Sequence, residues 1–117
     1  MIALSTGSLY NYGLARTFAL AKEAGFTGVE VIVDPRWDTR QADYLKRLIE
    51  QFDLPILSVH NSFTPGVTGW PHDAISSCKE SVKLAEAVGA RVVVLHLPVR
   101  LARIELHLRA LRQQPFI

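Results

Sequence analysis

The chain has 117 residues, of which 49% are hydrophobic and 21% charged, and its formal net charge at pH 7 is +2. This length favours one domain with its own hydrophobic core, and the composition is that of an ordinary soluble protein. So small a net charge makes a nucleic-acid partner unlikely on charge alone, and no apolar run is long enough to span a membrane. Residues 1–6 lack a basic start and a sustained apolar stretch, so we expect no signal peptide and a cytoplasmic protein.

Strands and helices are predicted to alternate along the chain, with the order β-α-β-α-β-α-β-α. The strands are expected at residues 2–6, 29–33, 56–60 and 91–96, where short apolar runs lie between turn signals. The helices are predicted from apolar residues at helical spacing: Leu14, Phe18 and Ala21; Ala42, Leu45, Ile49 and Phe52; Ile75, Cys78, Val82, Ala85 and Val88; Leu101, Ile104, Leu108 and Leu111. Strands that start about thirty residues apart indicate repeated βα units.

The helix ends are predicted from capping residues. Gly25 and Gly89 follow the first and third apolar stripes, as is typical of helix carboxyl ends. Asp38, with Gln41 three residues later, is expected to form a capping box at the start of the second helix. Cys78 is the only cysteine, so an internal disulfide is excluded, and its place in an apolar stripe predicts a small core residue.

Side chains alternate across a strand, and the alternation here separates an apolar face from a polar one. Val29, Val31 and Val33 are predicted on the apolar face with Leu57 and Val59. The other face is small or polar, and carries Ala3, Ser5, Glu30, Ser58 and His60. A doubly wound sheet would bury Glu30 at high cost, whereas a (β/α) barrel covers only one face with helices. We therefore predict parallel units of a TIM barrel.

Four strands make half of an eight-stranded barrel, which needs about 200 residues or more. A half barrel left alone would expose two sheet edges and its inner face. We therefore expect residues 1–117 to form a single partial barrel domain. It is either a fragment of a longer barrel or one of two copies that complete each other as a homodimer.

His60 and His96 are the leading candidates for a functional site. Each ends an apolar strand, and in parallel α/β folds ligands bind at the carboxyl ends of strands. Imidazole is a good ligand for Zn²⁺, Mn²⁺ or Co²⁺ and exchanges protons near neutral pH. Two ligands do not make a tight zinc site. The alternative is that both histidines bond only to the backbone.

Other polar and aromatic residues follow the same strands. Glu30 is predicted to orient a histidine or bind a substrate hydroxyl, or to make a structural hydrogen bond. Asp34 could line the rim or mark a turn before Pro35, and Asn61 could bind a substrate hydroxyl or turn the chain. Aromatic rings in these loops stack well on sugars but also cover cores; they are Trp37, Phe63 and Trp70. His72 and His107 are expected on the surface.

The segment from residue 91 onward carries five arginines against one acid, Glu105. A solvated helix face is the simpler interpretation, and a phosphate-binding patch is the alternative. The arginines are Arg91, Arg100, Arg103, Arg109 and Arg112.

Three motifs in order, AGFTGVE at 24–30, ILSVH at 56–60 and AVGARVVVLH at 87–96, resemble the xylose isomerase-like TIM barrel superfamily. The resemblance covers the whole chain but only the amino-terminal half of the family's barrel. It implies divalent-metal chemistry on a carbohydrate or sugar phosphate, with Zn, Mn, Co or Mg as the metal. In the endonuclease IV branch the positions of His60 and His96 bind zinc. In the isomerase and epimerase branch they more often contact substrate, and the metal is held by strands five to eight.

The predicted function is therefore that of a sugar or sugar-phosphate isomerase or epimerase, with metal-assisted proton transfer in the complete barrel. His60 and Glu30 are the expected catalytic residues, and His60 and His96 the expected metal ligands. Asn61, Trp37 and Trp70 are expected to contact a small carbohydrate substrate. The alternatives are an endonuclease IV-like zinc phosphodiesterase and a non-catalytic half barrel that associates with itself.

Overall fold

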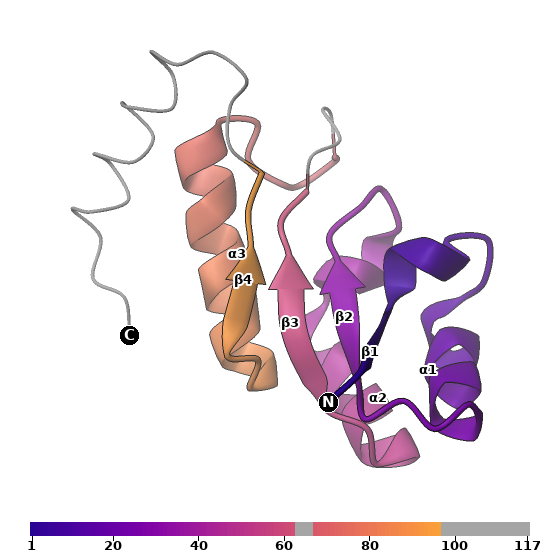
Figure 1. Ribbon diagram of the computed structural model, residues 1–117. Coiled ribbons are helices and arrows are strands. Elements are labelled where there is room, and N and C mark those ends of the chain that lie inside the picture. The colour runs from indigo at the N-terminus through magenta and orange to yellow at the C-terminus, as the bar shows by residue number, and fades with distance from the viewer. Residues whose placement is uncertain (63–66, 97–117) are drawn as a thin grey trace.

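The computed structural model describes residues 1–62 and 67–96, and these form an α/β arrangement like half of a TIM barrel (Figure 1). Four parallel strands lie side by side in the order β1-β2-β3-β4. The strands are β1 (Ala3–Ser5), β2 (Gly28–Ile32), β3 (Ile56–His60) and β4 (Val92–Val94). The α-helices are α1 (Leu14–Glu23), α2 (Ala42–Phe52) and α3 (Ala74–Val88), and two short 3₁₀ helices are η1 (Thr6–Leu9) and η2 (Trp37–Arg40). The predicted fold class is confirmed.

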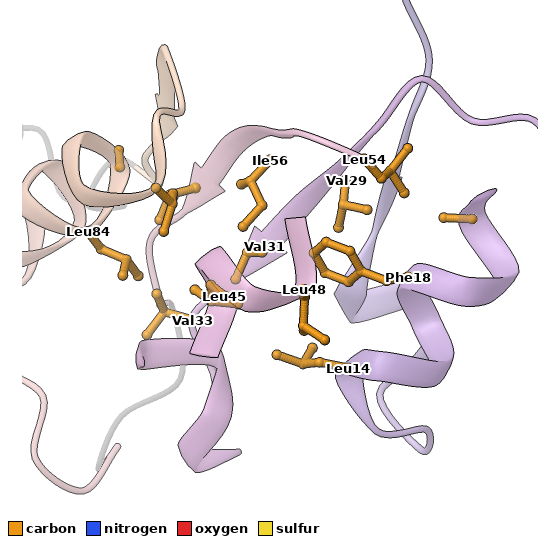
Figure 2. Packing of buried hydrophobic residues seen from close by; sticks show 14 of the residues in the cluster. Leu14, Phe18, Val29, Val31, Val33, Leu45, Leu48, Leu54, Ile56 and Leu84 are labelled. Atoms are coloured by element: carbon orange, nitrogen blue, oxygen red, sulfur yellow. The ribbon is translucent and has the colours of Figure 1, made fainter. Parts of the chain in front are cut away.

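The hydrophobic core lies between the sheet and the three α-helices. Val29, Val31 and Val33 are almost fully buried and face Phe18 of α1 and Leu45 of α2 (Figure 2). Further core residues come from β3 and α3: Ile56, Val59, Leu84, Ala85 and Val88. Because one layer of helices accounts for this core, the opposite face of the sheet carries the polar residues, as the alternation predicts.

Leu57 does not lie where simple alternation predicts it. The register between β2 and β3 shifts between Val29 and Glu30, so that Val29 pairs with Ile56 but Glu30 pairs with Ser58. This bulge inserts Leu57 as an extra residue. Its side chain covers Gly28, where a Cβ atom would come 2.3 Å from Leu57 Cγ. Leu57 therefore lies on the face of Glu30, and its predicted place beside Val59 is wrong.

The predicted capping box at Asp38 is also wrong. Helix α2 begins at Ala42 with Gln41 as its N-cap, and Asp38 lies inside η2. The buried Thr39 explains this: its hydroxyl donates to the Arg36 carbonyl at 2.8 Å and accepts from the Asp34 amide at 3.3 Å. These bonds close a separate turn before the helix starts.

The carboxyl ends of α1 and α3 follow the prediction, since Gly25 and Gly89 both adopt positive φ. The buried face of α3 is rotated relative to the predicted stripe. Cys78, Ala85 and Val88 are buried as expected, whereas Ile75 and Val82 are only half-buried. Two serines, Ser77 and Ser81, are buried instead. Burial raises the pKa of the Cys78 thiol.

Two further predictions concern the ends of the described chain. Strand β4 ends at Val94, so His96 lies two residues beyond the strand rather than at its last position. The predicted helix at 101–111 lies outside the described residues, as do Phe63, His107 and the last four arginines. Over residues 1–62 and 67–96, no helix has the length and apolar character needed to cross a bilayer.

Candidate functional site

The polar face of the sheet presents its side chains in rows across neighbouring strands. In one row, Ser5 of β1 pairs with Glu30 of β2, and Glu30 pairs with Ser58 of β3. In the next row toward the carboxyl ends, Ile32 pairs with His60 and His60 with Val94. The bulge at Leu57 decides this register. It places Ser58 beside Glu30 and His60 one step further on, so that one carboxylate can reach both.

The carboxylate of Glu30 makes a contact with each of these two residues. Ser58 Oγ donates to Glu30 Oε2 at 3.1 Å, and His60 Nδ1 lies 3.2 Å from Glu30 Oε1. The Glu30 side chain is 22% exposed and that of His60 is 16% exposed. A half-buried carboxylate needs polar partners to replace lost water, and these two residues provide them. Glu30 therefore has two polar partners on this face, and its catalytic role stays a prediction.

His60 and His96 come together at the carboxyl end of the sheet. Their Nε2 atoms are 2.7 Å apart, and their rings are stacked with centroids 4.9 Å apart and planes inclined by 21°. His60 is the last residue of β3 and His96 follows β4 by two residues, so the two lie thirty-six positions apart in sequence. Glu30, His60 and His96 thus form a continuous line of polar contacts from the middle of β2 to the loop after β4.

The protons in this line follow from the chemistry of its members. An ionised carboxylate can only accept, so His60 Nδ1 carries the hydrogen in its contact with Glu30. In neutral His60 the Nε2 atom then bears a lone pair, and His96 Nε2–H donates to it. The carboxylate therefore sets the tautomer of His60 and leaves its Nε2 as the acceptor at the rim.

Metal binding by the same pair would need a different proton arrangement, with the hydrogen of His96 on Nδ1 so that both Nε2 atoms bear lone pairs. A lone pair on His60 Nε2, with a carboxylate behind the other ring nitrogen, is the usual arrangement of a metal-binding histidine. A catalytic zinc takes three protein ligands, however. No group of three His, Cys, Asp or Glu side chains suited to a metal is present in the described part of the chain. These residues supply at most two ligands of such a site.

Asn61, predicted as a substrate contact, lies in a buried polar network. Its Oδ1 atom accepts from Ser77 Oγ at 2.8 Å and from Ser81 Oγ at 2.7 Å. Trp70, also predicted as a substrate contact, is only 9% exposed and its indole N–H donates to Ser77 Oγ at 2.8 Å. These bonds tie the residue after His60 to helix α3. The network thus holds the end of β3 in place, and substrate contact by either residue stays a prediction.

Trp37 has the opposite environment, with 66% of its surface exposed in the loop after β2. A cavity of about 400 Å³ lies nearby at the ends of β1 and β2, lined by Gly7, Tyr10, Ile32, Val33, Asp34, Pro35 and Arg36. Its walls are mostly apolar, as expected where the flat face of a sugar ring or an aromatic group is accommodated. Sequence reasoning identified the exposed aromatic ring but not the cavity.

An ion pair shapes one wall of this cavity. Arg36 Nε lies 3.0 Å from both carboxylate oxygens of Asp34, and its terminal nitrogens donate to the carbonyls of Thr6 at 3.2 Å and Tyr12 at 3.3 Å. These contacts of the Arg36 side chain join the loop after β1 to the loop after β2. Sequence reasoning treated Asp34 as a rim or turn residue and missed Arg36; their spacing of two residues across a turn was the available signal.

Comparison with known proteins agrees with this architecture. The family model described as xylose isomerase-like TIM barrel matches residues 18–113. Uncharacterized proteins of Mycobacterium leprae, Mycobacterium bovis and Mycobacterium tuberculosis are each 32% identical over 103 residues, which are 87% of this chain and 37% of theirs. The chain therefore spans little more than a third of the length of these curated relatives.

Two solved structures share the fold. The crystal structure of the apo form of the 3-keto-D-glucoside 4-epimerase YcjR from E. coli superposes with a TM-score of 0.69 at 16% identity, over 96% of this chain and 50% of that one. An AP endonuclease of family 2 from Brucella melitensis gives a TM-score of 0.60 at 18% identity, over 87% of this chain and 44% of that one. Together with the family match and the four parallel strands, these comparisons show that the chain belongs to the xylose isomerase-like TIM barrel family.

Proposed function

We propose that this chain contributes the proton-transfer half of a sugar or sugar-phosphate isomerase or epimerase. The observation that carries the proposal is the line of contacts from Glu30 through His60 to His96 at the carboxyl end of the sheet. Isomerases and epimerases of this kind move a proton at a carbon next to a carbonyl or hydroxyl group. That step needs a base whose lone pair is directed at the substrate and whose conjugate acid is stabilised.

His60 meets both requirements through Glu30. The carboxylate keeps the hydrogen on Nδ1, so the lone pair stays on Nε2 at the rim. When Nε2 takes a proton from substrate, the imidazolium that forms lies against the carboxylate and is stabilised by it. His96 Nε2–H donates to the same atom in the structure, so the substrate has to take the place of His96 before His60 Nε2 can accept its proton. Ser58 holds the other carboxylate oxygen and fixes its orientation.

A divalent cation held by His60 Nε2, His96 Nε2 and further ligands of the complete barrel would polarise the oxygen beside the reacting carbon. A ring nitrogen that binds a cation cannot accept a proton at the same time. Metal binding by this pair and proton transfer by His60 are therefore alternative roles, which the metal dependence of the reaction separates. The fold similarity to a 3-keto-D-glucoside 4-epimerase supports keto sugars as the first substrates to try.

The test is proton exchange in D₂O. The chain, and a complete barrel that contains it, would be incubated with keto sugars and sugar phosphates, with Mn²⁺ or Zn²⁺ or with EDTA, and loss of the C–H signal beside the carbonyl followed by NMR. We expect exchange that falls at least about 100-fold in His60→Gln, since general acid–base catalysis contributes about 10²–10⁴-fold. His72→Gln, at an exposed histidine before α3, is the matched control and should exchange normally.

Exchange that survives EDTA assigns His60 as the base, and exchange that requires metal assigns the histidine pair to the cation. The proposal would be abandoned if the complete barrel exchanges no substrate proton, or if both His60→Gln and His96→Gln exchange as fast as the unmodified protein. Cleavage of abasic-site DNA with steep salt dependence would favour the phosphodiesterase alternative instead.

A further inference from the structure

Arg40, at the end of η2, has an environment unlike that of the other arginine in the same loop. The guanidinium of Arg36 is satisfied by the Asp34 carboxylate and two backbone carbonyls. The Arg40 side chain makes no hydrogen bond or ion pair with any residue in the described part of the chain, and its Nε atom is buried without a partner. A buried guanidinium N–H that has lost water and gained no acceptor is unfavourable. Because Nε itself has almost no accessible surface, only the terminal nitrogens of Arg40 can meet the acceptor atoms of a ligand.

The surroundings of Arg40 leave room for that acceptor. Its guanidinium carbon lies 5.3 Å from the centre of the exposed Trp37 ring, which supports it by a cation–π contact. On another side is Gly69, in the loop before α3, where a Cβ atom would lie 3.6 Å from Arg40 Nη1 and 4.0 Å from the Trp37 ring. Gly69 has no side chain and adopts a φ of +75°, which favours glycine. The guanidinium is thus held between two loops with only backbone beside one terminal nitrogen.

These loops lie at the ligand-binding end of the sheet. Helix η2 follows β2, which carries Glu30, and Gly69 follows β3, which carries His60. The carboxyl ends of parallel strands point to the same edge, so η2, which ends with Arg40, follows a strand at the same end of the sheet as the histidine pair.

We propose that Arg40, stacked on Trp37, is an anion-binding site that holds a phosphate or carboxylate group of the ligand. A guanidinium binds both groups through parallel N–H···O bonds, and an aromatic ring stacked against it fixes the orientation of the guanidinium plane. Only one part of this inference depends on the proposed function, namely that the rest of the ligand is a carbohydrate. Anion binding itself needs neither proton transfer nor a metal.

The experiment titrates the full chain with inorganic phosphate, ribose 5-phosphate, gluconate and ribose at constant ionic strength. Tryptophan emission reports on Trp37 and Trp70 together, and the midpoint of thermal unfolding gives a second measure of binding. We expect a saturable response to phosphate and to at least one of the two charged sugars, and a weaker one to ribose. Response to ribose 5-phosphate alone assigns a phosphate group, and response to gluconate alone assigns a carboxylate.

Variants separate the site from general charge effects. Arg40→Gln should weaken anion affinity at least about 10-fold, because charge-assisted bonds are lost. Arg40→Lys keeps the positive charge but lacks the two parallel N–H donors of a guanidinium, so its loss of anion affinity should be intermediate. Arg47→Gln is the matched control, since Arg47 is exposed and also stacks on an aromatic ring, that of Tyr44, at 5.7 Å.

The inference is overturned if the unmodified chain shows no saturable response to any anion, or if Arg40→Gln and Arg47→Gln bind alike. Thermal stabilisation by phosphate in the unmodified chain keeps the test valid should a variant fold poorly. Tighter binding of duplex DNA than of ribose 5-phosphate through Arg40 would overturn the assignment to a small ligand. This experiment measures binding and not turnover. Failure of the anion-binding proposal can therefore be distinguished from failure of the proton-transfer proposal.

Discussion

The two faces of the sheet are built from alternating residues of the same strands but have different roles. On the helix-covered face, Val29 and Val31 are completely buried among side chains of α1 and α2. On the opposite face, Glu30 lies between them in sequence yet bonds to Ser58 and His60. Because the side-chain period of a strand is two, one strand supplies both the core and the site. The comparison implies that substitutions on the first face should act on stability and those on the second mainly on chemistry.

The largest effect is expected from the covered face. Phe18 is fully buried against Phe52, with ring centres 6.2 Å apart, and belongs to the same core cluster as Val29 and Val31. Phe18→Ala should lower the free energy of unfolding by about 3–5 kcal/mol, because apolar contacts are lost and a cavity is left. Urea denaturation measures this. Lys46→Ala, at an exposed position of α2, should change it by less than about 0.5 kcal/mol, and equal losses in the two variants would contradict the packing described.

Gly28 tests the junction between the two faces. A Cβ atom there would lie 2.3 Å from Leu57 Cγ and 3.0 Å from the Pro55 carbonyl oxygen. Gly28→Ala should therefore cost about 1–3 kcal/mol, since Leu57 and the bulge have to move. Gly13→Ala is the control, because a Cβ atom at Gly13 meets nothing within 4 Å and its φ of −64° suits alanine. Thermal melts that rank the two variants equally would show that the bulge is not tightly packed.

On the polar face, Glu30→Gln should separate stability from site chemistry. Its bonds are partly solvated, so we expect a loss of about 1 kcal/mol in unfolding free energy. A glutamine amide no longer requires the hydrogen to be on His60 Nδ1. If the histidine pair binds Zn²⁺, its affinity should fall about 10–100-fold, as is usual for partners behind a metal-binding histidine. Calorimetric titration checks this, with Glu50→Gln on the exposed side of α2 as the control. Unchanged affinity in Glu30→Gln would mean that the carboxylate does not orient His60.

The smallest effect is expected at the surface, where Asp73 caps α3. Its carboxylate accepts from the backbone N–H of Ser76 at 2.8 Å, and this bond holds the pKa of Asp73 below its ordinary value. Because the folded-state pKa is lowered, the contribution is present above pH 3.8 and is lost as pH falls through the folded value.

Asp73→Ala should therefore be less stable than the unmodified chain at pH 7, and the difference should shrink in acid. Asp73→Asn keeps an acceptor that does not titrate, so its stability relative to Asp73→Ala should vary little with pH. Thermal melts between pH 2 and 7 measure both. A difference between Asp73→Ala and the unmodified chain that grows in acid would rule out this account.

Much of the site follows from local patterns. The strand positions, the helix ends at Gly25 and Gly89 and the polar face of Glu30, Ser58 and His60 are all readable from the alternation of residue types. So is the meeting of His60 and His96, because parallel strands bring their carboxyl ends to one edge. Local patterns failed at Leu57 and Asp38. In the first case pairing with a neighbouring strand changed the register, and in the second the Thr39 hydroxyl closed a turn that residue propensities do not reveal.

The sequence by itself determined which residues could form strands, which face of each strand is polar and in what order the βα units follow. It did so because these properties depend on the side-chain period and on neighbours within a few positions. Only the tertiary structure decided that Glu30 serves both Ser58 and His60, that Trp70 is buried while Trp37 is exposed, and that Arg36 is paired while Arg40 is not. Each of these depends on contacts between segments far apart in the chain, and one shift in strand register alters all of the contacts along that strand.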